Sequence, residues 1–222
     1  MTNRINILYD DKFIAVAVKP SGLLSEGTDG SFPALLLEEL RQRRGASAPK
    51  EIFAVHRLDR ETEGIMVYAL DSRSAADLSE QIRIGEWDKI YHAVLCSAPS
   101  DDSGKLCDLL YYDRAKGRSY TVDRMRKGVK DAELDYTVIT RSSTSQRCLV
   151  RVKLGTGRTH QIRVQFASRR MPLCGDRRYG APAESGKRLA LAATELSFNH
   201  PKTKEKMSFK IDMPKEFGEL LS

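Results

Sequence analysis

The sequence predicts an α+β fold: a single domain with a largely antiparallel mixed central sheet, flanking helices and a functional cleft across the sheet. Segments with the patterns of strands outnumber helical segments along the 222 residues. The helical segments interrupt the strands irregularly, whereas a doubly wound fold alternates strand and helix regularly. No internal repeat, low-complexity tract or Gly/Ser/Pro linker divides the chain. One domain over residues 1–222 is therefore expected, which also suits this chain length.

The strands are predicted from short apolar or alternating runs that turn residues bound on both sides. These runs cover residues 5–9, 13–19, 53–55, 65–69, 89–96, 134–140, 148–154, 189–196 and 206–211. The segment 97–119 is rich in turn-forming residues, and we expect no strand there.

Three helices are predicted between the strands. In the first, Ser31 can cap the initial turn, Pro33 suits the first helical positions and Gly45 ends the helix. Its expected inward stripe consists of Leu35, Leu36 and Leu40. Residues 74–84 and 159–168 also have helical periodicity. Arg158 and Thr159 lie where a strand gives way to a helix, and such junctions commonly bind anions.

The chain has 37 Lys and Arg against 30 Asp and Glu, a formal net charge of +7. Its pI of about 9.2 favours a polyanionic partner, either nucleic acid or an anionic membrane surface. No apolar stretch approaches the roughly 18 residues of a membrane span, and the start lacks a secretory signal. We therefore expect a cytoplasmic protein with no membrane partner.

The cysteines stand far apart in the sequence and form no close pair of the kind that builds a zinc site. We expect all of them to be reduced and structural, namely Cys96, Cys107, Cys148 and Cys174.

The polar segment 56–64 lies between two apolar strands and places Asp59 between Arg57 and Arg60. By spacing alone, the simplest interpretation is a solvated surface ion pair of little energetic weight. By the same criterion Tyr91, on a strand that alternates in polarity, would serve only core packing.

The order of several motifs changes both interpretations. The segment 56–64 reads His-Arg-Leu-Asp-Arg-Glu-Thr-Glu-Gly, and Gly-Arg-Thr-His-Gln-Ile-Arg spans residues 157–163. The further motifs are Lys-Pro-Ser-Gly at 19–22, Lys-Ile-Tyr-His-Ala-Val at 89–94, Gly-Asp-x-x-Tyr-Gly at 175–180 and Leu-Ser-Phe-x-His-Pro at 196–201. Together they resemble the RluA-type pseudouridine synthases over residues 8–215. Two departures are Glu63, where the family usually has Ser, and Ala192, where a His is common.

The resemblance implies an RNA pseudouridine synthase that isomerises specific uridines in structured ribosomal or transfer RNA. The uridine would be flipped out of its stack, its glycosidic bond cleaved with Asp59, and the base rotated and rejoined through carbon 5. Asp59 could attack the anomeric carbon, remove a sugar proton or attack the uracil ring, and all three roles stay open. Tyr91 would stack on uracil, and its hydroxyl is the candidate to handle the carbon 5 proton. Arg163 would pair with Asp59, contact a phosphate, or do both at different steps.

The resemblance implies neither a metal nor an organic cofactor. His56 and His160 are assigned to structural hydrogen bonding. Arg57 is the family's candidate to fill the gap left by the flipped base, and Arg158 is a second RNA-binding residue.

A basic segment at 114–130 predicts further RNA contacts. A charge run is usually a solvated face, but Gly117 and Gly128 favour a mobile arm that closes over an RNA stem. The residues expected to bind RNA in this arm are Arg124, Arg126 and Lys127. A second stripe of arginines comprises Arg169, Arg170, Arg177 and Arg178.

We expect a stand-alone catalytic domain, because Lys19-Pro20 lies too near the start for a preceding RNA-binding module. We also expect a monomer, because the sequence has no obvious apolar surface stripe. Two rival functions are less compatible with these residues. A catalytically silent RNA-binding protein would not require Asp59, Tyr91 and Arg163 together. A glycosidase mostly uses two positioned carboxylates, and no second carboxylate is evident.

Overall fold

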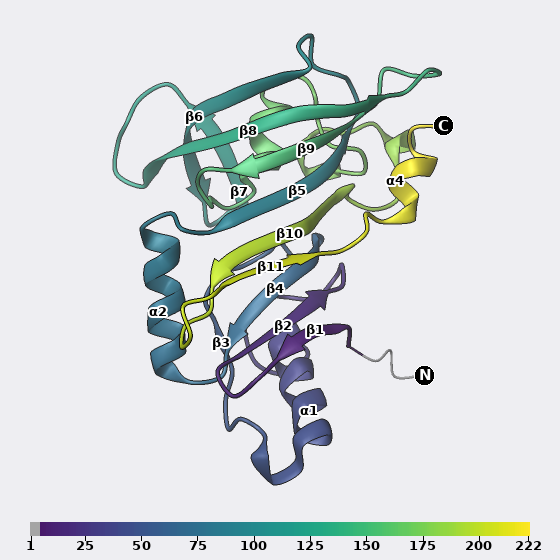
Figure 1. Cartoon of the computed structure of the whole chain (residues 1–222). Helices are drawn as coiled ribbons and strands as arrows, with labels where there is room; N and C mark the ends of the chain where they lie inside the picture. Colours follow the sequence, from purple (N-terminus) through teal and green to yellow (C-terminus); the bar gives the residue numbers. More distant parts are fainter. Residues whose placement is uncertain (1–4) are drawn as a thin grey trace. The chain divides into compact units, whose positions relative to one another are not determined.

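The computed structural model describes residues 5–222, which divide into two compact units. Unit 1 comprises the chain up to Lys89 together with Ala193–Ile211, and unit 2 comprises Ile90–Ala192 together with Asp212–Ser222. Antiparallel strand pairs predominate in both, with few helices (Figure 1), which confirms the α+β class. One domain over 1–222 stays a prediction. The prediction that the chain starts without a secretory signal concerns in part residues 1–4, which lie outside the described residues.

Unit 1 contains a sheet in which β1, β2, β4 and β10 follow one another, with β3 beside β4 and β11 beside β10. Its strands are β1 (Ile7–Asp10), β2 (Ile14–Lys19), β3 (Phe53–Ala54), β4 (Glu63–Ala69), β10 (Leu191–Asn199) and β11 (Lys206–Lys210). Its helices are α1 (Phe32–Arg44), the short 3₁₀ helix η1 (Gly45–Ser47) and α2 (Ser72–Arg83). The strands, except for small shifts at their ends, are those predicted.

Strand β4 is buried on both faces, because its side chains alternate between two layers of packing. Ile65 and Val67 join a cluster with Leu78 of α2. On the other face, the ring of Tyr68 lies 6.0 Å from that of Phe32 in α1. The continuous apolar sequence of β4 follows from this double coverage, and the loop that precedes β4 is thereby attached to a rigid strand.

The first helix differs from the prediction in two details. Ser31 occupies the N-cap position, but its hydroxyl donates to the carbonyls of Gly27 and Thr28 instead of accepting from the helix. Leu36 and Leu40 are buried, whereas Leu35 is 44% exposed. Helix α2 is capped more conventionally, since Asp71 accepts a 2.9 Å hydrogen bond from the Ser74 N–H.

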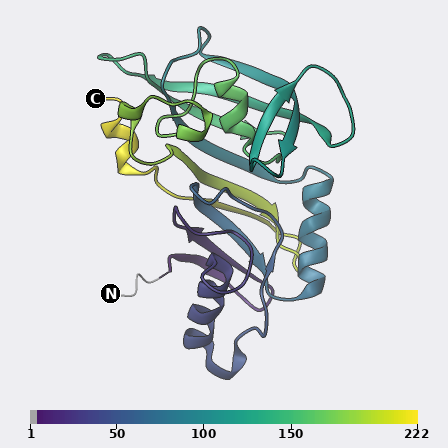
Figure 2. The ribbon, with the colours of Figure 1, turned by 180° about the vertical axis from the view of Figure 1, so that it is seen from behind.

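Unit 2 is built on strands in the order β5, β9, β8, β6, β7, all antiparallel to their neighbours. These strands are β5 (Asp88–Leu95), β6 (Ser103–Asp113), β7 (Arg118–Val122), β8 (Val129–Arg141) and β9 (Cys148–Leu154). The helical segments are α3 (Gln161–Ala167), η2 (Arg177–Tyr179), η3 (Ala183–Ser185) and α4 (Lys215–Glu219). Figure 2 shows α3 and the green segments around it against one face of these strands. There Val164 and Tyr179 pack against Leu110 and Ala132.

The expectation that 97–119 contains no strand is wrong, because β6 runs through eleven of its residues. Strand β6 pairs with β8 from Ser103↔Thr137 to Tyr111↔Val129. Only Leu106 and Leu110 among its side chains are buried, so polar residues on the solvent-facing side gave the sequence the appearance of turns. No helix within the described part of the chain is long and apolar enough to cross a membrane.

Candidate active site

Asp59 lies half-buried in the loop between β3 and β4, and its neighbour Leu58 fixes that loop. The Leu58 N–H donates to the Ser25 hydroxyl at 2.9 Å, and the same hydroxyl donates to the Leu58 carbonyl at 2.6 Å. Both side chains are buried. The Thr62 N–H closes the turn on the Asp59 carbonyl at 3.1 Å. The backbone on both sides of Asp59 is therefore hydrogen-bonded within unit 1.

Gly64 is the second residue of β4, and glycine is the only residue type that fits this position. Its φ is +137°, and a Cβ there would overlap the backbone of Ala193 in β10. The final Gly of the 56–64 motif thus has a structural cause. Glu63, the departure from the family pattern, begins β4 and is half-buried.

Lys19 is a site residue to which the sequence assigned no role. Its side chain is buried, and the ammonium donates to the carbonyls of Pro20, Leu23 and Arg60 at 3.0, 2.9 and 3.3 Å. Burial lowers the pKa of Lys19 to about 8, against the opposing attraction of first Asp59 and then Glu61 and Glu63. The ammonium therefore joins the Lys-Pro-Ser-Gly turn to the Asp59 loop and places a positive charge near the carboxylate.

His56 takes the structural role expected of it. Its Nε2 accepts a 3.0 Å hydrogen bond from the Val67 N–H in β4, and its ring meets Trp87 edge-on with centroids 5.2 Å apart. Burial, and secondarily the charge of Lys89, lowers the pKa of His56 to about 3. The imidazole is therefore neutral at ordinary pH and acts as an acceptor.

Tyr91 lies on β5, where it is 7% exposed and stands opposite Val152 of β9. Tyr91 and Arg163 belong to unit 2, whereas Asp59 belongs to unit 1. Each is described here within its own unit, and the joint action of the three on one nucleotide stays a prediction.

Arg163, on α3, forms a buried bidentate pair with Asp176. Its Nε and Nη2 donate to the two carboxylate oxygens at 2.7 and 2.8 Å, and the arginine side chain is only 3% exposed. The Tyr179 ring centroid lies 5.2 Å from the same guanidinium. Such a fork fixes the plane and direction of the arginine. Asp176 and Tyr179 are therefore positioning residues for Arg163. Both belong to the Gly-Asp-x-x-Tyr-Gly motif at 175–180, which was the sequence signal that could have predicted this role.

The turn before α3 is folded by Gln161, whose side-chain oxygen accepts from the Arg158 N–H at 3.0 Å and the Thr156 hydroxyl at 2.8 Å. The next residue back along the chain, His160, forms a 3.0 Å hydrogen bond between its Nδ1 and the Tyr179 hydroxyl. His160 has φ of 54°, an uncommon left-handed backbone for a residue other than Gly. His160 is thus part of the local framework, as its structural assignment predicted.

The predicted RNA-binding residues occupy different surroundings. Arg57 is exposed and pairs with Glu26 at 3.1 Å, whereas the half-buried Arg158 donates from Nε to the Asp131 carbonyl at 2.8 Å. The segment 114–130 is not a free arm throughout, because it contains β7 and the start of β8. Two parts of it are exposed: the turn 114–116 between β6 and β7, and the loop 123–128, which connects β7 to β8 past the intervening β6 (Figure 1). This loop contains Arg124, Arg126 and Lys127.

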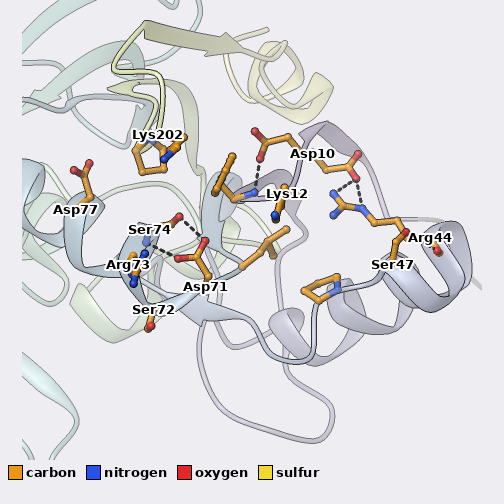
Figure 3. Close-up of a pocket in the computed structure, with 15 residues that line it drawn as sticks. Asp10, Lys12, Arg44, Ser47, Asp71, Ser72, Arg73, Ser74, Asp77 and Lys202 are labelled. Carbon is orange, nitrogen blue, oxygen red and sulfur yellow. Dashed lines mark hydrogen bonds and ion pairs between the residues drawn. The ribbon is translucent and has the colours of Figure 1, made fainter.

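A hollow of about 1090 Å³ in unit 1 contains none of the predicted site residues (Figure 3). Several of its charged side chains are engaged locally: Asp10 accepts from Arg44, and Asp71 caps α2. Within residues 5–222, no group of three or more His, Cys, Asp or Glu side chains could hold a metal ion. The Asp59 loop is therefore the stronger candidate site.

Comparison with known proteins identifies the family. The model of the RNA pseudouridylate synthase family matches residues 14–168. An uncharacterized RNA pseudouridine synthase of Aquifex aeolicus is 35% identical over 98% of this chain and 72% of its own length. The dual-specificity RNA pseudouridine synthase RluA of Haemophilus influenzae is 32% identical over 92% of this chain and 91% of its own. Human RNA pseudouridylate synthase domain containing 4 superposes with a TM-score of 0.79 at 25% identity, covering 97% of this chain and 91% of that one.

These likenesses define the class of the protein as an isomerase that acts on RNA. The chain belongs to the RluA-type family of RNA pseudouridine synthases, as its sequence motifs predicted.

Proposed function

We propose that this chain converts specific uridines of folded ribosomal or transfer RNA to pseudouridine, with Asp59 as the group that begins the reaction. The observation that carries this assignment is the fixed backbone around Asp59, held by Ser25 and Lys19. A reacting group must be held close to its productive geometry, and a rigid second layer of hydrogen bonds serves that purpose.

The proposed reaction is an isomerisation in which the base stays bound while its bond to ribose moves from nitrogen to carbon 5. Asp59 acts as an anion, either on the anomeric carbon, on a sugar proton or on the uracil ring. The nearby Lys19 ammonium favours that charge. Tyr91 stacks on the uracil and handles the proton of carbon 5. Arg163, held in a fixed direction by Asp176, supplies a further cation for Asp59 or for a phosphate.

Arg57 is proposed to occupy the place of the flipped uridine. Its side chain is 61% exposed and its ion pair with Glu26 is a surface pair, which is worth little in free energy. The guanidinium can therefore exchange Glu26 for a phosphate or stack on neighbouring bases at small cost. Arg158, at the turn before α3, is proposed to bind an RNA phosphate through its guanidinium, since its backbone N–H already donates to Gln161.

The substrate classes follow from the relatives. The Haemophilus relative is named dual-specificity, and tRNA pseudouridine synthase C of Vibrio cholerae is 27% identical over 98% of this chain. A ribosomal large subunit pseudouridine synthase D of Neisseria meningitidis is 32% identical over the same share. We therefore propose ribosomal RNA, transfer RNA or both as substrates. A cytoplasmic monomer completes the proposal, and sedimentation of the free protein tests its oligomeric state.

Asp59→Asn tests the assignment directly. The amide keeps the size of the side chain but removes the anion, so pseudouridine formation should fall by about 1000-fold or more. The assay is release of tritium from carbon 5 of uridine in cellular RNA extracted from cells that lack the gene. RNA affinity and thermal midpoint should stay close to those of the unmodified protein.

Glu61→Gln is the matched control, because it removes an exposed carboxylate two residues away in the same loop. It should retain turnover. Substantial turnover by Asp59→Asn, or a loss of stability that accounts for its loss of activity, would contradict the catalytic role.

A further inference from the structure

Two cysteines that lie far apart in the sequence meet in unit 2. Cys96 follows β5 and Cys174 lies beyond α3, and the two segments join through an antiparallel bridge between Leu95 and Leu173. The Cys96 N–H donates to the Pro172 carbonyl at 2.9 Å, and the Cys174 N–H donates to the Val94 carbonyl at 2.8 Å. The two sulfur atoms are 3.5 Å apart. The backbone therefore already holds the thiols at hydrogen-bonding distance.

The two thiols differ in exposure and in acidity. Cys96 is half-buried, and hydrogen bonds from first Cys174 and then Ser185, together with the charge of Arg147, lower its pKa to about 7. Cys174 is fully buried, and the hydrogen bond with Cys96 and burial raise its pKa. Redox-active cysteines commonly combine an accessible thiolate with an adjacent resolving thiol.

We propose that Cys96 and Cys174 form a dithiol site that small-molecule disulfides such as oxidised glutathione convert to an intramolecular disulfide. The Cys96 thiolate attacks one sulfur of the small disulfide, breaks its S–S bond and releases one thiolate. The Cys174 thiol then loses its proton and attacks the Cys96 sulfur of the mixed disulfide, which releases the second small thiol. The protein gives up two electrons and two protons, and the small disulfide becomes two thiols.

The local backbone suits such a bond. The Leu95↔Leu173 bridge places the two cysteines at diagonal positions on the same face of the paired segments. The sulfurs must approach from 3.5 Å to about 2.05 Å, so both side chains must turn toward each other. Gly175 holds the following turn through its N–H to the Ser185 hydroxyl at 3.1 Å. The other two cysteines lack this arrangement: Cys107 is exposed on β6, and burial raises the pKa of Cys148 to about 11.

The test exposes the reduced full-length chain to oxidised glutathione without oxygen, followed by alkylation of free thiols and mass spectrometry. The unmodified protein should lose the mass of two hydrogen atoms, and its four alkylatable thiols should fall to two. Peptide mapping should find Cys96 joined to Cys174. Cys174→Ser should instead accumulate one glutathione on Cys96, since the resolving thiol is missing.

Cys107→Ser is the matched control, because it removes the exposed cysteine and should still form the same disulfide. Four alkylated thiols after treatment, modification of Cys107 alone, or a disulfide to Cys148 would overturn the proposal. The measurement on the unmodified protein decides the matter even where a serine variant fails to fold.

Discussion

At the scale of single residues, the site relies on side chains that the reaction itself does not use. One hydroxyl, that of Ser25, engages both backbone groups of Leu58, so the residue next to Asp59 cannot rotate without breaking two hydrogen bonds. Asp176 does the same for Arg163 through two charge-assisted hydrogen bonds. Replacing Ser25 or Asp176 would leave the buried group that it binds without a hydrogen-bond partner. We therefore expect these two positions to tolerate few substitutions.

Tyr91→Phe separates the two roles proposed for the tyrosine. The phenyl ring keeps the area that stacks on uracil, so RNA affinity should change by less than about threefold. Loss of the hydroxyl should lower turnover by about 100-fold or more if that group handles the carbon 5 proton. Single-turnover kinetics and filter binding with the same RNA measure the two effects.

Tyr111→Phe is a suitable control, since it removes a tyrosine hydroxyl from β6 instead of from β5. Equal turnover by Tyr91→Phe and the unmodified protein would refute the proton role and leave stacking to be tested by Tyr91→Leu.

The sequence revealed the site residues to different extents. Asp59, Tyr91 and Arg163 could be predicted as site residues because they stand in short contiguous motifs. The role of Lys19 was not predicted, because its ammonium donates to the carbonyl of a residue 41 positions away in the sequence. The contact between Cys96 and Cys174 was not predicted either, because sequence spacing does not reveal a contact between residues 78 positions apart.

At the scale of elements, apolar periodicity was sufficient for strands in which apolar residues form a short run or alternate regularly. It failed for β6 and β7, whose polar faces resemble turns and a charged arm. Much of the basic segment is thus sheet, and β7 pairs with β6 from Leu109↔Val122 to Asp113↔Arg118. The part of the segment 114–130 that can form an arm over an RNA stem is consequently reduced to the short exposed turn 114–116 and the longer exposed loop 123–128.

Replacing Arg124, Arg126 and Lys127 together by Gln tests this loop as a capture surface. The slope of log affinity against log salt should become shallower by about 0.7 to 0.9 for every phosphate that the variant no longer neutralises. RNA binding should weaken at low salt, while turnover at saturating RNA should survive, because phosphate contacts position the substrate and do no chemistry. Equilibrium binding at several salt concentrations gives the slope.

The control replaces Lys202, Lys204 and Lys206 by Gln, an equal change of charge in the turn after β10 and at the first residue of β11. If the two triple variants have the same salt slope, the loop 123–128 is only a solvated surface. The arginine stripe around Arg169 and Arg178 then becomes the alternative candidate for the surface that captures RNA.

At the scale of the whole molecule, two compact units raise the question of whether unfolding is a single transition. The chain offers a natural reporter, because its one Trp, Trp87, lies in the core of unit 1. Trp fluorescence therefore follows unit 1, while circular dichroism follows the strands and helices of both units. Coincident urea transitions by the two probes would favour the predicted single domain.

The same reporter tests how His56 makes unit 1 sensitive to acid. The folded pKa of His56, about 3, lies below the unfolded value of about 6.5, so the unfolded chain binds the extra proton between these values. The stability contribution is fully present above pH 6.5 and is lost as the pH falls towards 3. Between pH 7 and pH 4.5 the free energy of unfolding should fall by about 2 kcal/mol on this account. Urea titrations followed by Trp87 fluorescence at the two pH values measure it.

His56→Gln provides the comparison, because the Gln side-chain oxygen can accept from the Val67 N–H in place of the imidazole nitrogen and does not titrate. The variant should be less stable at pH 7 because it loses the ring contact with Trp87. Its stability should nevertheless depend on pH less steeply, by the same 2 kcal/mol or so, since every carboxylate titrates alike in both proteins. Parallel pH profiles of the two proteins would show that His56 is protonated in the folded state, contrary to its buried acceptor role.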